Sequence, residues 1–323
     1  MKNTLSHITE VHEECTTYHE GNALWSFVKH SWIVLLLLLL SLNIQAQRRV
    51  PDPNPLFPDT LRKGRLIGVL TTQGAIYAGS MTGLYFLWYK DYPQTNFHFF
   101  NDNSEWLQMD KMGHFFSSYY LSSIVYSSYR WAGVKEKRSI LFGTLLSYAF
   151  MLNIEILDGF SAGWGFSPGD LAANTAGCLL FMGQQLGWHE QRFLIKYSYH
   201  PSKYPQYNPD LLGTNIVQNL VKDYNGMSFW LSGNIHSFLP KHSRFPAWLN
   251  IAVGYGAEGL GVNVPEFDRY RKFFLSLDVD LTKIPTRSKT LKGIFTILNL
   301  IKIPFPAIEY NTKGEFIFHP LYF

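Results

Sequence analysis

An uncharged segment that leads into an acidic, glycine-rich loop constrains the fold of this chain more than any other feature. Residues 139–154 carry no charge, and Glu155, Asp158 and Asp170 follow them. Glycine reaches backbone conformations that other residues avoid, and four glycines lie between these carboxylates, at positions 159, 163, 165 and 169. The sequence therefore predicts two apolar helices that meet at an acidic corner.

The composition favours contact with a membrane. Of the 323 residues, 46% are hydrophobic and only 16% are charged, against about 25% charged residues in ordinary soluble domains. The aromatic content of 16% suits a membrane interface. A formal charge of +4 without a dense Lys/Arg cluster argues against a nucleic-acid partner. Membrane lipid or another envelope component is the expected partner, and a soluble protein with an aromatic core is the alternative.

The N-terminal region has the pattern of a secretory signal. Lys29 precedes a leucine-rich run, and the small residue Ala46 follows it. The run of roughly ten to twelve apolar residues is shorter than the ~20 residues that cross a bilayer as a helix. We therefore expect residues 1–46 to be an N-terminal extension with a cleaved signal peptide. Cleavage near Ala46 would leave Cys178 as the sole cysteine, which excludes a disulfide framework.

Four long helical segments follow a Pro-rich linker over residues 47–64. Ser167 followed by Pro168 is typical of a helix start, with the serine as N-cap and the proline at the first helical position. The helices are expected over residues 66–89, 104–131, 137–157 and 167–188. Together they predict a helical bundle domain over residues 65–204.

The C-terminal part has a different texture, with shorter segments in which bulky and polar residues alternate. Strands are expected from residue 227 and over residues 247–255, 272–281 and 314–318, and helices over 211–224 and 288–302. Four or five strands are too few to close a barrel of at least eight. The predicted fold class is thus α+β, mainly α: an up-down bundle of four long, moderately apolar helices followed by a small β-containing C-terminal domain over residues 205–323.

The charges in the connections bear on location. Basic residues gather before the first helix, between the second and third, and after the fourth, whereas the other connections are acidic. In the inner membrane the basic end should be cytoplasmic, but a cleaved signal would place it outside. We favour export, with the protein in the periplasm or at the outer membrane; a multi-pass inner-membrane protein is the alternative.

Polar residues stand in pairs near the expected acidic end of the bundle. Members of each pair are three or four positions apart, which places them on one helix face. In an antiparallel bundle the start of the second helix, the end of the third and the start of the fourth lie at the same end, so the three pairs would come together there. The pairs are Asp110 with His114, Glu155 with Asp158, and Asp170 with Asn174.

This set allows two interpretations. In the first, His114, Glu155 and Asp158 bind a divalent metal, or these three residues and Asp170 perform acid/base catalysis, because crowded carboxylates raise one another's pKa.

In the second, the same side chains form a structural polar network. Asp110, Lys111 and Asn174 then hold the helices together, and Asp170 acts as a capping acid. Glu155, near the C-terminal end of an apolar helix, needs a partner, for which His114 or Lys111 is suited.

The motifs resemble a known family. They are Asp110-Lys-Met-Gly-His114-Phe115, the segment from Glu155 to Gly159, Phe166-Ser-Pro-Gly-Asp170-Leu171, and the segment from Asn174 to Gly177. Over roughly residues 60–200 the chain resembles the YfiM-like family of predicted periplasmic lipoproteins, in the long version seen in Bacteroidetes-type bacteria. The order of these residues is also similar to that in VanZ-like membrane proteins. The YfiM-like resemblance implies an envelope location and no established reaction.

The sequence thus predicts an exported, membrane-associated envelope protein whose polar cluster has a structural or ligand-binding role. The alternative is a metal-dependent or acid/base hydrolase or transferase that acts on envelope lipid or glycan. Both alternatives stay open at this point, and a divalent metal is the cofactor expected in the second.

Overall fold

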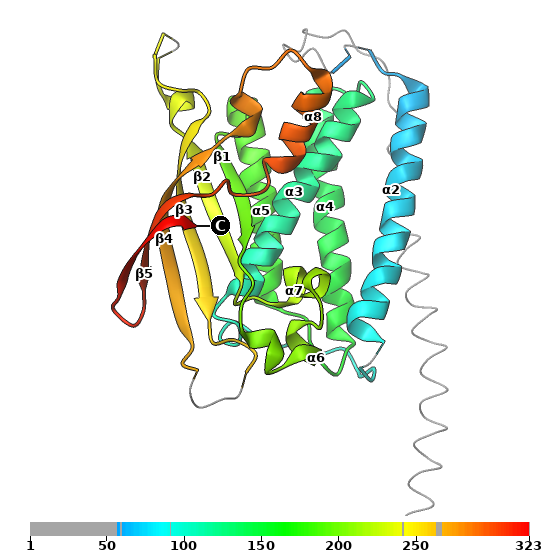
Figure 1. The fold of residues 1–323 in the computed structure, drawn as a ribbon. Coiled ribbons are helices and arrows are strands. Elements are labelled where there is room, and N and C mark those ends of the chain that lie inside the picture. Colours follow the sequence, from blue (N-terminus) through cyan, green and yellow to red (C-terminus); the bar gives the residue numbers. More distant parts are fainter. Residues whose placement is uncertain (1–56, 59, 91, 241, 263–266, 323) are drawn as a thin grey trace, which may run out of the picture. The chain divides into compact units, whose positions relative to one another are not determined.

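The computed structural model describes residues 57–322 apart from residues 59, 91, 241 and 263–266. The predicted signal peptide over residues 1–46 and most of the predicted linker over residues 47–64 lie outside the described residues. Across the part it describes, the chain forms seven α-helices and one six-stranded antiparallel sheet (Figure 1). The chain divides into two compact units.

The first unit comprises the described residues of Met1–Phe100 together with Ser123–Phe166. It contains α2 (Lys63–Leu84), the π-helical turn Tyr85–Tyr89, the second half of α3 (Met109–Trp131), and α4 (Glu136–Gly159). Its core is a small apolar cluster from α2, α3 and the turn after α3, formed by Leu66, Val69, Tyr129, Ala132 and Val134.

Helix α4 stands out by its hydropathy. Among the helices that the structure describes, it alone is both long and apolar enough to cross a membrane: it has 24 residues and a mean hydropathy of 1.8 in its most apolar window. Only 33% of that window is buried within the protein. Among the apolar side chains of α4, Leu141 and Leu145 are the exposed ones, at 49% and 54%.

The second unit comprises Asn101–Ser122 and Ser167–Phe323. Its helices are the first half of α3, α5 (Pro168–Trp188), α6 (Pro209–Leu212), α7 (Ile216–Lys222) and α8 (Lys289–Leu298). The predicted start of the helix at Ser167 is confirmed, because Ser167 Oγ accepts a hydrogen bond from the Asp170 N–H at 3.1 Å and Pro168 is the first helical residue. The local sequence alone therefore defines this helix end.

The sheet belongs entirely to the second unit, and its strands follow one another in sequence order (Figure 1). They are β1 (Phe193–Tyr199), β2 (Met227–Asn234), β3 (Leu249–Glu258), β4 (Tyr270–Val279), β5 (Phe305–Asn311) and β6 (Phe316–Tyr322). Tyr322 of β6 contacts the rings of Trp230 on β2 and Phe274 on β4. Since β3 to β5 lie between β2 and β6 in the strand order, the sheet curls around the face that carries Trp230.

The predicted fold class is wrong, although the four long helices themselves are confirmed as elements. The chain does not form a bundle followed by a small β-containing domain, because a six-stranded sheet shares its compact unit with α5 and half of α3. Met109 at the start of α3 packs against Met227 and Phe229 of β2. The apolar face of that helix thus serves the sheet, which helical periodicity alone does not reveal. Strands β1 and β5 were not predicted.

The alternation predicted for residues 272–281 is confirmed in β4. We call the side of the sheet that carries Phe273, Leu275 and Leu277 the outer face; these side chains are 43%, 48% and 42% exposed. The other side, the inner face, carries Ser276 and Asp278, which are buried. At Leu275 to Asp278 the usual sense of the alternation, apolar inward and polar outward, is therefore inverted, whereas Phe274 on the inner face is apolar and buried.

A buried ion pair occupies the inner face. Lys196 Nζ of β1 lies 2.8 Å from Asp278 Oδ2 of β4, and both side chains have no exposed surface. Ser232 of β2 donates a further hydrogen bond to Asp278 at 2.7 Å. These contacts satisfy the charges that the curled sheet encloses.

The close approach of α3 and α5 in the second unit can be tested at Gly177. A Cβ at this position would overlap Ser118 Oγ and the carbonyl oxygen of Phe115, both on α3. We expect Gly177→Ala to lower the free energy of unfolding by about 1–3 kcal/mol, because the backbone has to move apart. Chemical denaturation followed by circular dichroism measures the change.

Gly183→Ala is the matched control, since nothing lies within 4 Å of its Cβ on the same helix. This variant should be neutral or stabilised by up to about 1 kcal/mol through helix propensity. Equal effects at the two positions would contradict the close packing.

Candidate functional site

A cluster of polar residues joins the start of α3 to the start of α5 in the second unit. It is called the charged cluster here, and its members come from the loop before α3, from the first turns of α3, and from the N-terminus of α5. They are Asp102, Asp110, Lys111, His114, Ser167, Asp170 and Asn174.

Lys111 lies at the centre of this cluster. Its Nζ is 2.5 Å from Asp102 Oδ2, 2.9 Å from Asp170 Oδ1 and 3.3 Å from Asp110 Oδ2. The side chain is only 11% exposed. Burial by itself would lower the pKa of the Lys111 ammonium, but Asp110, Asp102 and Asp170 together raise it above its usual range. Lys111 is therefore a fixed cation among three carboxylates.

Asp170 holds its proton more tightly than an ordinary aspartate. Burial raises its pKa to about 7, the negative charge of Asp110 adds to the rise, and His114 and Lys111 oppose it. Its Oδ1 lies 2.9 Å from Lys111 Nζ, with which it forms an ion pair. The cluster thus contains a carboxyl that titrates near neutral pH.

Ser167 connects the cap of α5 to the cluster. Its hydroxyl donates to Asp102 Oδ1 at 2.7 Å while it accepts the Asp170 N–H. The same side chain that begins the helix therefore also orients a carboxylate that contacts Lys111.

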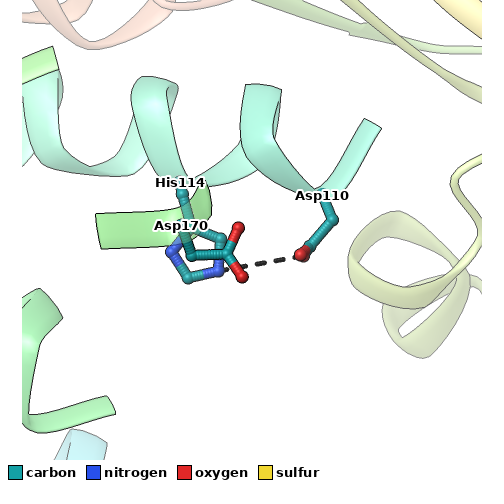
Figure 2. Close-up of side chains that lie close together, drawn as sticks. All are labelled: Asp110, His114 and Asp170. Atoms are coloured by element: carbon teal, nitrogen blue, oxygen red, sulfur yellow. Dashed lines mark ion pairs between the residues drawn. The ribbon is translucent and has the colours of Figure 1, made fainter. Parts of the chain in front are cut away.

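His114 is held from both sides of its ring. Its Nδ1 lies 3.2 Å from Asn174 Oδ1, and its Nε2 lies 3.8 Å from Asp110 Oδ1. Because an amide oxygen can only accept, this contact requires the proton on Nδ1. In the neutral ring the lone pair of Nε2 then faces the carboxylates of Asp110 and Asp170, which point toward it (Figure 2).

Asp110 is the more acidic of these two carboxyls. Burial would raise its pKa, but His114, Lys111 and a hydrogen bond from Tyr224 hold the pKa below its usual value. The Tyr224 hydroxyl donates to Asp110 Oδ1 at 2.8 Å. The environments of Asp110 and Asp170 therefore push their pKa values apart.

Three residues of the cluster offer ligand atoms for a metal ion. One atom each from Asp110, His114 and Asp170 lies within 4.8 Å of the others. Two ligands of one tetrahedral ion are about 3.4 Å apart at bond lengths of about 2.1 Å. Small side-chain rotations would therefore bring the three atoms to binding distance.

The predicted site residues Glu155 and Asp158 lie in the first unit, on α4. Glu155 is buried, with 1% of its surface exposed. Asp158 accepts a hydrogen bond from the Tyr89 hydroxyl at 2.7 Å. Burial, followed by the charge of Asp158, raises the pKa of Tyr89 above its usual range. Their participation in one site with His114 stays a prediction.

Two members of the neighbourhood were not predicted to take part. Asp102 lies in the acidic connection before α3, and its sequence context carries no motif. Tyr224 is 114 positions from its partner Asp110. A contact over this distance leaves no periodic signal in the sequence, so only the fold reveals it.

The pKa of Asp170 predicts a specific pH dependence of stability. The unfolded carboxyl releases its proton near 3.8 and the folded one near 7, so the folded state binds more protons between these values. The free energy of unfolding should therefore fall as the pH rises from about 4 to about 7, by at most about 1.4 kcal/mol per pH unit.

Asp170→Asn should lack this part of the slope, since an amide does not titrate. The lowered pKa of Asp110 acts below pH 3.8 and thus outside this window. Denaturation of both proteins at pH 4, 5.5 and 7 measures the difference. Parallel stability curves for the wild type and the variant would contradict the raised pKa.

The comparisons with known proteins bear on this region. Residues 98–182 match the model of a family described as "Predicted periplasmic lipoprotein (DUF2279)". This confirms the predicted YfiM-like resemblance, whereas the likeness to VanZ-like membrane proteins is not borne out. Comparisons with curated proteins and with solved structures give no match. Residues 98–182, which include every member of the charged cluster, are therefore similar to a family of predicted periplasmic lipoproteins of unknown function.

Proposed function

We propose that this is an exported, membrane-associated protein of the cell envelope in which the charged cluster is a structural joint. The cluster ties the start of α3 to the start of α5 within the second unit. The finer features of this proposal are a signal peptide over residues 1–46, cleavage near Ala46, and attachment to the outer membrane.

The location is supported by the family description and by composition. The family is one of predicted periplasmic proteins, and the charged content of the chain is only 16%. Helix α4 is long and apolar enough to cross a membrane. These observations favour an envelope protein in contact with lipid over one that is free in solution.

The position of Lys111 is the observation that supports the structural role. Its ammonium lies within 3.3 Å of Asp102, Asp110 and Asp170. A cation that is already shared by three carboxylates neutralises part of their charge and links the loop before α3 to the N-terminus of α5. Removing one partner of such a buried group lowers the free energy of unfolding by far more than the intact pair contributes to it, because the remaining charges stay buried without compensation.

Lys111→Met tests the joint. We expect the free energy of unfolding to fall by about 3 kcal/mol or more, since methionine has a similar length but leaves three carboxylates without their cation. Chemical denaturation of the detergent-purified exported protein measures this change.

Lys137→Met is the control, because Lys137 is exposed at the first turn of α4. Its effect should stay within about 0.5 kcal/mol. A Lys111→Met protein as stable as the control would refute the structural role.

A divalent metal site is the second candidate, and the arrangement of ligand atoms favours it. Asp110, His114 and Asp170 present these atoms within 4.8 Å of one another. Three carboxylates outweigh the single charge of Lys111, so the cluster keeps an excess of negative charge. Asn174 would orient His114 as a second-layer partner does in metal sites.

In this second reading the protein is a metal-dependent or acid/base hydrolase or transferase that acts on envelope lipid or glycan. His114 and Asp170 would serve in its catalytic site, and Asp170 has the pKa of an acid/base group near neutral pH. Glu155 and Asp158 belong to this reading as predicted from the sequence.

Metal analysis separates the two candidates. In the metal reading, the wild type binds about one equivalent of Zn²⁺ or Mn²⁺, and His114→Ala loses it while remaining folded. In the structural reading, neither protein binds metal and His114→Ala unfolds at a lower temperature. Titration calorimetry with the metal salt measures the metal stoichiometry, and a thermal scan of the same samples measures the unfolding temperature.

His319→Ala is the matched control. His319 also pairs with a carboxylate, Glu309, at 2.8 Å, but it lies on the sheet. A metal equivalent that is lost equally in His319→Ala would show that the ion binds elsewhere, and would contradict the site at His114.

A further inference from the structure

We propose that the outer face of β3 to β6 binds the acyl chains of one membrane leaflet. This inference deepens the envelope location proposed above and rests on it. It names the surface that contacts lipid, which is distinct from both the charged cluster and α4.

A continuous apolar row crosses the sheet. Successive Cα partners in the register of β2 to β6 are Leu231, Val253, Leu275, Ile308 and Phe318. Each of these side chains is exposed, by 39%, 52%, 48%, 50% and 65%. Single exposed apolar residues are normal, whereas a row over five strands indicates a contact surface.

A row of aromatic residues lies beside the aliphatic row. Tyr255, Phe273, Tyr310 and Phe316 are successive partners from β3 to β6. Two positions further along β4, on the same side, comes Arg271, whose side chain donates to Gln108. The order from aliphatic to aromatic to charged is that of a surface crossing from the hydrocarbon region to the headgroups.

The inner face is more polar than the buried side of an ordinary soluble sheet, although it also carries the small apolar cluster of Trp230, Ala252 and Phe274. In a soluble sheet the apolar side covers the core and the polar side meets water. Here the inner face holds charged and polar groups, among them Lys196, Asp278 and the Glu309–His319 pair. Apolar side chains outside with polar side chains inside are the pattern of strands whose outer solvent is lipid.

Part of the outer face is covered by the protein itself. The start of α3 packs on Phe229 of β2 through Met109, and Phe229 lies on the same side of the strand as Leu231. The exposed part therefore begins beyond this contact and continues to the edge strand β6.

The height of the face decides between crossing a membrane and entering one leaflet. Phe273 and Leu277 delimit the exposed apolar residues of β4, and four residues of a strand span about 13 Å. The apolar band of a membrane barrel is about 25 Å tall, and a bilayer core is about 30 Å thick. On β4 the outer face thus matches a single leaflet of about 15 Å and is shorter than the core of a bilayer.

A lipid surface also fits better than a second copy of this chain. Protein interfaces have a polar rim around an apolar centre. On this sheet the apolar character increases toward the edge, where Phe316 and Phe318 are 77% and 65% exposed. Exposed aromatic side chains at the sheet edge favour lipid as the occupant.

An environment-sensitive fluorophore on the outer face tests the proposal. The exported full chain with Leu275→Cys, in a background that carries both Cys15→Ala and Cys178→Ala, is labelled and mixed with vesicles of phosphatidylethanolamine and phosphatidylglycerol. We expect a blue shift of the emission and quenching by nitroxide groups on the acyl chains. The same label at Gln206→Cys, an exposed polar position of the second unit, should show neither, and the unsubstituted background gives the baseline.

A second variant measures the contribution of the face to binding. Leu275→Glu combined with Ile308→Glu should reduce the vesicle-bound fraction at least about tenfold, because charges on a lipid-facing strand are costly. Gln206→Glu is its control and should bind like the wild type, since Gln206 is exposed and polar.

Two outcomes would overturn the proposal. One is a label at Leu275 that stays in water while the protein is bound to vesicles. The other is a blue shift that appears without vesicles and grows with protein concentration, which would assign the face to a second copy of the chain. Cell fractionation separates these results from a failure of the proposed location, because in that case the wild type itself would be absent from the envelope.

Discussion

The arrangement of the sheet depends on the buried ion pair between Lys196 and Asp278. Both side chains are fully enclosed, and Lys196 Nζ also donates to the carbonyl oxygen of Val279 at 2.6 Å. The desolvation cost of burying two charges is offset only when further hydrogen bonds satisfy them, and Ser232 donates one to Asp278. The pair thus requires polar residues on the inner face. The period of two along each strand then places the apolar residues on the outer face, since neighbouring side chains point to opposite sides.

The charged cluster also contains a buried lysine paired with carboxylates, but its ratio of positive to negative charges is different. Lys111 is one cation among three carboxylates, so the pKa of Asp170 rises to about 7 through burial and the charge of Asp110. At Lys196 the charges match one to one. An excess of negative charge near His114 is what distinguishes the cluster from a purely structural pair. It makes the cluster the place where a divalent cation would be attracted, while Lys111 already provides the structural contact.

The inverted sheet and the apolar helix α4 are separate reasons to expect contact with lipid. Helix α4 is apolar along a length that can cross a bilayer, whereas the outer face of the sheet is about half the height of a barrel band. Each surface lies in a different compact unit. A chain with only 16% charged residues can supply both surfaces, because few charges interrupt its apolar segments.

The sequence by itself determined the features that depend on neighbouring residues. The four long helices follow from uncharged segments between glycines and charged connections, and the start of α5 follows from Ser167 and Pro168, because a cap is a local hydrogen bond. The pairing of Asp110 with His114 follows from one helical turn. The alternation in β4 was also evident, since it needs only the strand period.

Only the tertiary structure decided which elements share a core and which face of the sheet is buried. Strand β1 was not evident because its lysine, Lys196, is buried through a partner that is 82 positions away, on β4. Lys111 and Tyr224 likewise acquire their roles from carboxylates that the fold brings to them. Sequence patterns record which residues are apolar, but the pairing of buried charges across distant elements depends on three-dimensional proximity. The predicted helices are therefore present, but the six-stranded sheet that shares a compact unit with two of them was not predicted.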